Sequence, residues 1–332
     1  MRIGFVGYGE AAYHIAKGLQ QPGIESISAF DIDVTNKVRQ RAGETETRLV
    51  ETNRELAESC DIMMSAVTAN QAKNAADQNA PYLTADHIYA DLNSVSPGLK
   101  QSIAHVIEAS GARFAEIAMM APVPPYGHKV PMLAGGNGAR EFVERLAPFG
   151  ISAEIVSREV GTAAATKMFR SIIVKGMEAL ITECVLGATR YNADERVFAS
   201  LAETFPGIHW QELADYMVGR VVVHGERRAR EMEEVADTLR EIDIEPIMAE
   251  AIVRRMDWSV EAGLKQVFRG EAPKSYRDVV DAVEGQAERH QSGGRRASGC
   301  ACAVGEYAGC CNAIARCSSG GSRRCGEWCE CG

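Results

Sequence analysis

The glycine-rich segment Gly7-Tyr-Gly-Glu-Ala-Ala12 constrains this chain most, because it directly follows a short apolar run at residues 2–6 and opens a helical stretch. Gly7 permits a tight turn, Gly9 lets the backbone approach a pyrophosphate, and Ala12 allows close packing of helix on strand. The start of the helix attracts the phosphate charge. The segment therefore predicts a dinucleotide site, with cofactor contacts from Gly7, Tyr8, Gly9, Glu10, Ala11 and Ala12.

Asp31 ends the second predicted strand, at residues 26–30, about 20 residues after the glycine turn. A carboxylate at this place accepts hydrogen bonds from the adenosine ribose and repels a 2′-phosphate. No arginine occurs between Asp31 and Arg39. NAD is therefore the predicted cofactor, and Lys37 and Arg39 leave NADP possible.

Short apolar runs and helical stretches alternate over the first 160 residues, which predicts an α/β Rossmann-like, doubly wound parallel sheet. Strands are expected at residues 2–6, 26–30, 62–66, 87–91, 113–117, 131–134 and 151–155. Helices are expected at residues 10–20, 34–42, from 70 onward, and at 97–110.

After residue 160 the pattern becomes helical, beginning with a long, largely apolar and therefore well-buried helix over residues 162–190. This change predicts a dinucleotide-binding domain at 1–160 and an all-α domain at 161–285. From about Gln286 the chain is rich in Gly, Ser, Arg and Cys, so residues 286–332 are expected to lack a packed core.

Eight of the 10 cysteines lie in this tail, between Cys300 and Cys331. Metal binding, a disulfide framework, and disorder or an out-of-frame translation are the three interpretations. The spacings form no paired metal motif, and a disulfide framework conflicts with the expected cytosolic, reduced character of the body. Disorder or an out-of-frame segment is favoured, and no metal site is predicted.

The net charge of −9 argues against binding to nucleic acid or to an anionic membrane surface. The first residues do not resemble a signal peptide, and no apolar run is long enough to span a bilayer. A cytoplasmic location is expected.

Lys167 stands near the start of the long apolar helix. It is either a surface lysine at a helix end or a general acid/base whose pKa is lowered by burial, and the spacing alone leaves both interpretations open.

The layout of residues 1–285 resembles the β-hydroxyacid dehydrogenase family and its relative 6-phosphogluconate dehydrogenase. The resemblance rests on four segments, which are the Gly7 turn, Asp91-Leu-Asn-Ser-Val-Ser-Pro97, Gly135-Gly136, and Gly161 with Lys167. It implies an NAD-dependent oxidoreductase acting on a small, anionic hydroxy acid or on a sugar acid, phosphorylated or not, with Lys167 as catalytic acid/base. It also implies that residues 161–285 form a substrate and dimerisation domain, and therefore a homodimer. Cofactor contacts are implied for Val67, Thr68, Asn93 and Ser94.

Two departures from the family concern the substrate. Met119-Met-Ala121 stands where the family has Ser-Gly-Gly for the substrate carboxylate, and Ser171 replaces an asparagine one turn after Lys167. Farther along the helix, Lys175 and Glu178 are interpreted as ordinary polar positions rather than supports of the site.

The second half resembles the small C-terminal domain of poorly characterised, 6-phosphogluconate dehydrogenase-like bacterial proteins. His224, Arg228 and Glu231 share one face of a helix, which is favoured as a solvated, salt-bridged face. Alternatively, His224 or Arg228 contacts an anionic substrate, and His128 and Lys129 are comparable candidates.

Two other functions remain open on the sequence. One is an enzyme of the same fold that reduces imines, which the presence of Lys167 disfavours. The other is a non-catalytic, NAD-binding regulatory protein, which the missing Ser-Gly-Gly segment supports.

Overall fold

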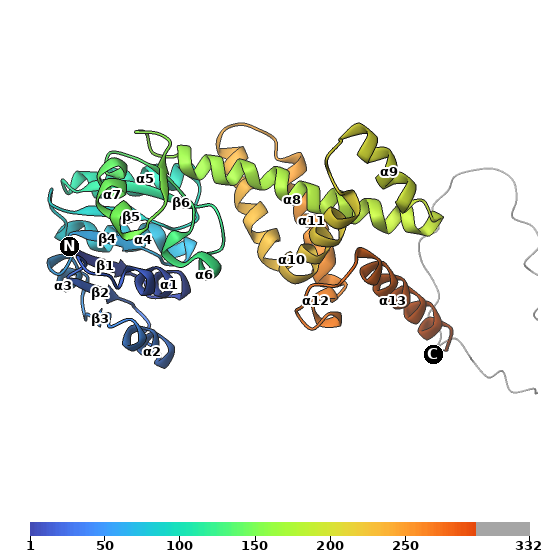
Figure 1. Cartoon of the computed structure of the whole chain (residues 1–332), viewed down its shortest axis with the longest axis horizontal. Helices are drawn as coiled ribbons and strands as arrows, with labels where there is room; N and C mark the ends of the chain where they lie inside the picture. Colours follow the sequence, from blue (N-terminus) through green and yellow to red (C-terminus); the bar gives the residue numbers. More distant parts are fainter. Residues whose placement is uncertain (297–332) are drawn as a thin grey trace, which may run out of the picture. The chain divides into compact units, whose positions relative to one another are not determined.

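A computed structural model describes residues 1–296, and Met1–Val283 form one compact unit. The unit begins with an eight-stranded sheet of order β3-β2-β1-β4-β5-β6-β7-β8 (Figure 1). Within these strands β6 and β7 pair antiparallel, and the other neighbours pair parallel. The predicted fold class, a doubly wound, mostly parallel sheet followed by helices, is confirmed.

All seven predicted strands are present, with limits shifted by a few residues. The strands are β1 (Arg2–Val6), β2 (Ser26–Phe30), β3 (Arg48–Leu49), β4 (Ile62–Ser65), β5 (Ile88–Asp91), β6 (Arg113–Met119), β7 (Met132–Gly135) and β8 (Ala153–Ile155). The helices around them are α1 (Glu10–Leu19), α2 (Asn36–Glu44), α3 (Asn53–Glu58), α4 (Ala72–Asn79), α5 (Pro97–Ala109), α6 (Val123–Tyr126) and α7 (Ala139–Leu146). β3 was not predicted, because two residues are too few to show a strand period.

Alternate residues of the strands face two different cores, which explains why the strands read as continuous apolar runs. In β4, Ile62 and Met64 join the core that contains α1 and α7. Met63 joins the core on the other face, together with residues of α4 and α5. Helices therefore cover both faces of the sheet, and the carboxyl ends of its strands carry the turns that follow.

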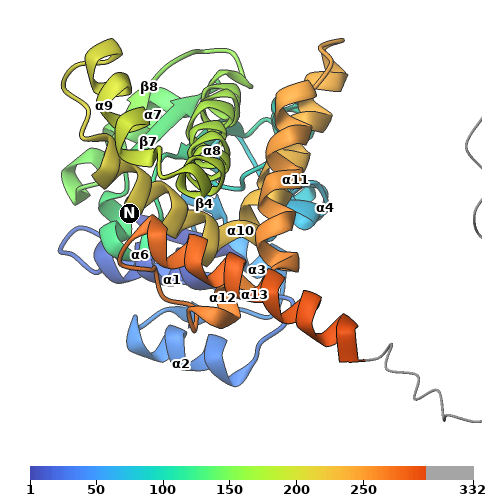
Figure 2. The same ribbon diagram turned by 90° about the vertical axis from the view of Figure 1, so that its right-hand side faces the viewer.

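The remaining helices form the second half of the unit. They are α8 (Thr162–Ala188), α9 (Asp194–Thr204), α10 (Trp210–Glu241), α11 (Ile247–Glu261), α12 (Leu264–Val267) and α13 (Tyr276–Arg296). α10 packs against both α8 and α11, as the turned view of Figure 2 shows for α10 and α11. α8 is less buried than expected, since Ile173 and Leu180 are 66% and 62% exposed.

α13 continues through Arg296, so the first residues of the segment 286–332, for which disorder was favoured, are helical. A helix satisfies its backbone hydrogen bonds locally and needs no core to do so. The Cys-rich segment from Cys300 lies outside the described residues, and the domain limits at 160 and 285 stay predictions. Within residues 1–296, no helix is long and apolar enough to cross a membrane, and no His, Cys, Asp and Glu side chains group as a metal site.

Candidate active site

The turn between β1 and α1 has the backbone that a dinucleotide site needs. Gly7 has φ +82°, and a Cβ atom on it would lie 2.8 Å from the carbonyl oxygen of Ala66. A Cβ atom on Gly9 would meet no protein atom within 4 Å, so the backbone there faces open space. Gly9 precedes the first turn of α1, whose free N–H groups attract a phosphate.

Asp31 follows β2 and is held by two backbone donors. Its carboxylate accepts hydrogen bonds from the N–H of Tyr8 at 2.7 Å and of Asp33 at 2.9 Å. Each carboxylate oxygen keeps a further lone pair, so a ribose hydroxyl can still bind.

A cavity of about 370 Å³ joins these two features. The open backbone at Gly9 and the fixed carboxylate of Asp31 both line it, which fits the pyrophosphate and the adenosine ribose of a dinucleotide. Its predicted lining residues are Gly7, Gly9, Glu10, Ala11, Asp31, Val67 and Thr68, and Phe30, Asn53, Gln71, Asn74 and Gln78 are among the others.

Three residues that were predicted to contact the cofactor have side chains with structural roles instead. The side chain of Tyr8 is buried, and its hydroxyl hydrogen-bonds those of Thr45 and Thr47 at 2.6 and 2.8 Å. Ala12 is fully buried in the core between α1 and the sheet. Asn93 lines neither this cavity nor the next, because it donates to Ser65 Oγ and accepts from Val67 N, which ties the ends of β4 and β5 together.

A second cavity, of about 510 Å³, shares Glu10 and Ala11 with the first. One face of α8 and one face of α10 line it, together with Ser94 and the segment after β6. From α8 come Lys167, Met168, Arg170, Ser171, Val174 and Lys175. From α10 come Arg220, His224, Arg227, Arg228, Glu231, Glu234 and Val235. A group bound in the first cavity can therefore reach the side chains of the second.

Lys167 lies in this second cavity, and burial lowers the pKa of its ammonium group to about 8. The positive charges of Lys100 and Lys175 lower it further, while Glu231 and Glu234 act in the opposite direction. An amine with this pKa exchanges protons readily near neutral pH.

Lys100, which was not predicted, is the positive charge that lowers the pKa of Lys167 most. It is 1% exposed, and its Nζ lies 3.0 Å from the carboxylate and 2.7 Å from the backbone oxygen of Asp91. In the sequence it interrupts the apolar face of α5 formed by Ile103, Ala104 and Ile107, which was the available signal.

Glu116 joins β6 to the start of α8. Its buried carboxylate accepts from the N–H groups of Gly161 and Ala164, both at 2.7 Å. Gly135 is its partner across the β6–β7 pair, and a Cβ atom there would lie 2.9 Å from Glu116 Oε2. The glycine thus leaves room for the carboxylate that holds the helix bearing Lys167.

Buried ion pairs connect α8 with α10, so two sequence interpretations are wrong. Lys175 and Glu178 are not ordinary polar positions, since Lys175 pairs with Glu231 at 3.0 Å and Glu178 with Arg228 at 2.8 Å. Arg228 is not on a solvated face, because it is 2% exposed. Arg220 contacts the same Glu178 carboxylate at 2.9 Å.

The predicted substrate residues divide into two groups. Met119, Ser171, His224 and Arg228 line the second cavity. His128 and Lys129 do not, because the short helix Gly127–Lys129 packs on α1 and places His128 against Gly18, near the end of α1 opposite the phosphate site. Ser171 donates to the backbone oxygen of Lys167 at 3.1 Å.

Several charged lining residues were missed, namely Arg170, Arg220, Arg227 and Glu234. Helical spacing from Lys167 would have indicated Arg170, one turn away. Burial raises the pKa of Glu234, as does its neighbour Glu231. Burial and the charge of Arg227 lower the pKa of His224.

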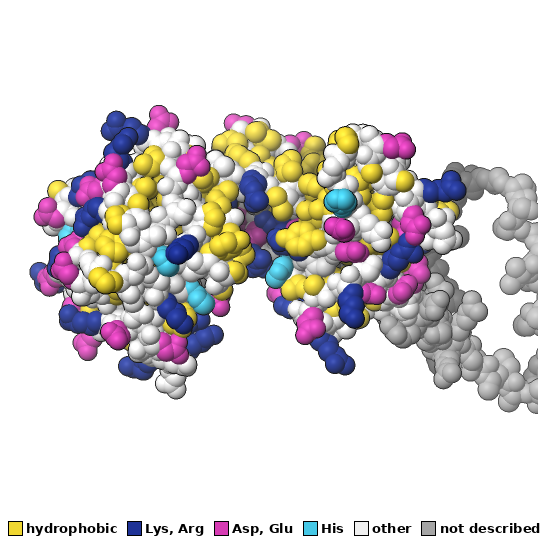
Figure 3. All heavy atoms as spheres, viewed as in Figure 1, with side chains coloured by type: hydrophobic (Ala, Val, Ile, Leu, Met, Phe, Trp, Pro, Cys, Tyr) yellow, Lys and Arg dark blue, Asp and Glu magenta, His cyan; other side chains and the backbone are white. Residues whose placement is uncertain are grey.

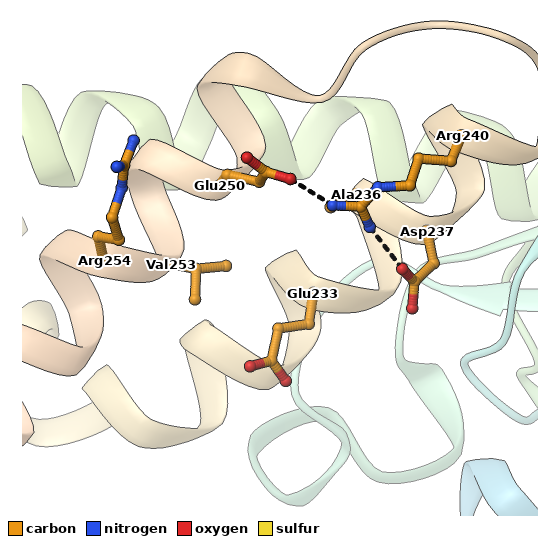
Figure 4. Close-up of a pocket in the computed structure, with 7 residues that line it drawn as sticks. All are labelled: Glu233, Ala236, Asp237, Arg240, Glu250, Val253 and Arg254. Carbon is orange, nitrogen blue, oxygen red and sulfur yellow. Dashed lines mark hydrogen bonds and ion pairs between the residues drawn. The ribbon is translucent and has the colours of Figure 1, made fainter.

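A third hollow, of about 500 Å³, lies between α10 and α11 and is shown in Figure 4. The guanidinium group of Arg240 lies between Asp237, at 2.7 Å, and Glu250, and pairs with both. Glu233 pairs with Arg230. This hollow contains no predicted site residue, and its charges largely satisfy one another.

Two family models match the chain. The NAD binding domain of 6-phosphogluconate dehydrogenase matches residues 2–123, and a domain of unknown function, DUF1932, matches residues 188–259. The first match contains the turn at Gly7 and Asp31, and the second contains α10.

Solved structures and a sequence relative agree with these matches. A conserved hypothetical protein from Sinorhizobium meliloti is 35% identical, with 85% of this chain and 95% of that chain covered and a TM-score of 0.75. A conserved protein of unknown function, described as similar in structure to 3-hydroxyacid dehydrogenases, is 31% identical, with coverages of 80% and 99% and a TM-score of 0.71. An uncharacterized 28.5 kDa protein of Methanothermus fervidus is 27% identical over 75% of this chain and 94% of its own.

At greater distance, the 3-hydroxyisobutyrate dehydrogenase of Mycobacterium tuberculosis shares the fold, with 12% identity, coverages of 86% and 99%, and a TM-score of 0.64. The resemblance seen in the sequence is confirmed. The chain belongs to the 6-phosphogluconate dehydrogenase-like family of NAD-binding proteins with a hydroxyacid dehydrogenase-like fold, in the group that carries the DUF1932 domain.

Proposed function

We propose that the protein is an NAD-dependent oxidoreductase that interconverts a hydroxy acid and its keto form. The observation that carries this proposal is the position of Lys167, whose pKa is lowered to about 8, in a cavity that adjoins the dinucleotide cavity. An acid/base group beside a nicotinamide suits hydride transfer at an alcohol carbon.

Different residues of the chain bind the cofactor and transfer the proton. The start of α1 holds the pyrophosphate and Asp31 the adenosine ribose. A bound nicotinamide would supply the acceptor for the hydride that leaves the carbinol carbon. Lys167, as the uncharged amine, accepts the hydroxyl proton, and the carbon–oxygen bond becomes a carbonyl.

NAD rather than NADP is proposed as the cofactor. Asp31 lines the cavity, and no lysine or arginine side chain lines it beside this carboxylate among the residues that the structure describes. A 2′-phosphate would therefore meet a negative charge with no cation to offset it.

The substrate is proposed to be an anion. Six of the side chains that line the second cavity are lysine or arginine, and three are glutamate. Figure 3 shows lysine and arginine side chains gathered between the sheet and the long helices. Arg170 makes no ion pair with any residue in the described part of the chain, so its guanidinium group is free for a carboxylate.

The test is a screen of hydroxy acids with NAD and NADP, followed by Lys167→Ala on each acid that is oxidised. We expect kcat to fall by about 10²–10⁴, with the dissociation constant for NAD unchanged. Lys17→Ala, which removes an exposed lysine of α1, is the matched control and should retain activity. Full activity in Lys167→Ala, or no turnover of any acid, would refute the proposed function, and a clear preference for NADP would refute the cofactor.

A further inference from the structure

The second cavity has an apolar side as well as a charged one. From this arrangement we infer that the substrate is an amphipathic hydroxy acid, whose hydrocarbon substituent lies against the segment that follows β6. The inference rests on the proposed function and narrows its substrate class.

Residues 119–124, Met-Met-Ala-Pro-Val-Pro, form this apolar wall, and all six line the cavity. No side chain among them carries a hydroxyl, amide or charged group. Two are prolines and have no N–H, and the N–H of Met120 already donates to the backbone oxygen of Pro131 at 2.8 Å. The wall therefore provides few hydrogen-bond donors for an acid group, and its side chains provide apolar contacts for a hydrocarbon chain.

Part of the apolar wall is accessible from the cavity. Val123 is buried in the core, but Met119 at the end of β6, Met120 and Ala121 are only partly buried, and Pro122 and Pro124 are exposed. Val174 of α8, which is partly buried, adds apolar surface. Methionine side chains are flexible and polarizable, so they adapt to ligands of irregular shape.

The charged side of the cavity would bind the acid group at the other end of the substrate. Most of its ions satisfy one another, because Lys175 and Arg227 pair with Glu231, and Arg220 and Arg228 pair with Glu178. Lys167 and Arg170 form no ion pair with the other described residues. The first is the proposed acid/base, which leaves Arg170 for the acid group.

The volume also favours more than a minimal hydroxy acid. The cavity of about 510 Å³ falls within the range of about 300–1,000 Å³ that accommodates drug-sized ligands. Glu10 and Ala11 line both cavities, so a bound nicotinamide would occupy part of this space. A larger hydrocarbon group can fill what remains.

The test measures kcat/KM with NAD for unbranched α- and β-hydroxy acids from butanoate to octanoate. We expect kcat/KM to rise about threefold for each added methylene, because each buried methylene favours binding by a similar factor. Polar acids of equal length, such as sugar acids, should be poorer substrates than their alkyl counterparts.

Four variants locate the effect. Met120→Ser should reduce the gain per methylene, and Met120→Leu should restore it. Tyr126→Ser is the control, since Tyr126 lies two residues after the apolar wall, is 51% exposed and does not line the cavity. Arg170→Gln should lower kcat/KM about tenfold for every acid and leave the gain per methylene unchanged. Thermal unfolding of each variant checks that the fold is retained.

The outcomes separate this inference from the proposed function. Turnover that does not increase with chain length, or that is best for sugar acids, overturns the inference and leaves the proposed function in place. A Met120→Ser variant with a raised KM for NAD and an unchanged gain per methylene assigns the apolar wall to the nicotinamide, and also overturns it. If none of the acids, polar or apolar, is oxidised with NAD, the proposed function itself is overturned.

Discussion

At the scale of single residues, the chemistry of Lys167 depends on neighbours from other elements. Burial between α8 and α10 lowers its pKa, and Lys100 of α5 adds a positive charge. Glu234 of α10 opposes this effect and forms no ion pair with the described residues. The balance of these charges sets the pH at which the amine becomes uncharged.

This balance of charges predicts how kcat/KM depends on pH. Oxidation requires the uncharged amine, so kcat/KM should rise with pH and level off above a pKa of about 8. Reduction requires the ammonium form, so its rate should fall above the same pH. Glu234→Gln removes a charge that favours the ammonium form, and should move the rise to lower pH by about half a unit.

The control for this shift is Glu233→Gln. Glu233 precedes Glu234 but pairs with Arg230 and does not line the cavity, so its replacement should leave the pH profile unchanged. An unmoved profile in Glu234→Gln, measured over the same pH range, would show that Glu234 does not act on Lys167.

At the scale of elements, Glu116 fixes where α8 begins. Its carboxylate on β6 occupies the place of a helix cap, since Gly161 has no side chain to accept from the first N–H groups of α8. Lys167 stands one turn after Ala164, the second residue that Glu116 binds. The position of the lysine relative to the sheet therefore depends on this contact.

Glu116→Ala should lower the free energy of unfolding by about 3 kcal/mol, because two buried N–H groups lose a charged acceptor. Glu141→Ala, which breaks a partly exposed pair with Arg113, should cost less than about 1 kcal/mol. Urea denaturation measures both. If Glu116→Ala is no more destabilising than the control, the carboxylate does not hold the helix.

A less disruptive change tests the same contact in catalysis. Glu116→Gln keeps an acceptor for one N–H group but loses the charge. We expect a lower kcat with an unchanged dissociation constant for NAD, because the cofactor cavity does not include Glu116.

At the scale of the whole molecule, α8 presents apolar side chains that the described chain does not cover. Ile173 and Leu180 are seven residues apart on one face of α8 and are 66% and 62% exposed. Figure 3 shows hydrophobic side chains exposed over the long helices. Burying such a face against a second copy of the chain would remove it from water.

We therefore expect a homodimer in which α8 lies at the interface. Sedimentation equilibrium should give twice the mass of the chain, and Leu180→Glu should shift the protein toward the monomer. Ile208→Glu, a change at a partly exposed residue between α9 and α10, is the control. A native protein that stays monomeric at micromolar concentration would contradict the expectation.

The sheet and its dinucleotide turn could be predicted because they depend on short stretches of chain. The apolar run of β1, the glycines at positions 7 and 9, and Asp31 at the end of β2 are read from local period and backbone preference. Short elements such as β3 lacked such a period, and α13 extended beyond its apolar part because a helix needs only local hydrogen bonds.

What the sequence by itself determined is therefore the fold class, the glycine turn of the NAD-binding domain and the position of Lys167 near the start of the long helix. Only the tertiary structure decided which charges surround that lysine, since Glu116 lies 45 residues from its partner Gly161, and Glu178 pairs across two helices with Arg220 and Arg228. It also removed His128 and Lys129 from the site and added Arg170. Periodicity shows which face of a helix is polar, but the packing of one element on another decides which polar groups are buried together and which stay free for a substrate.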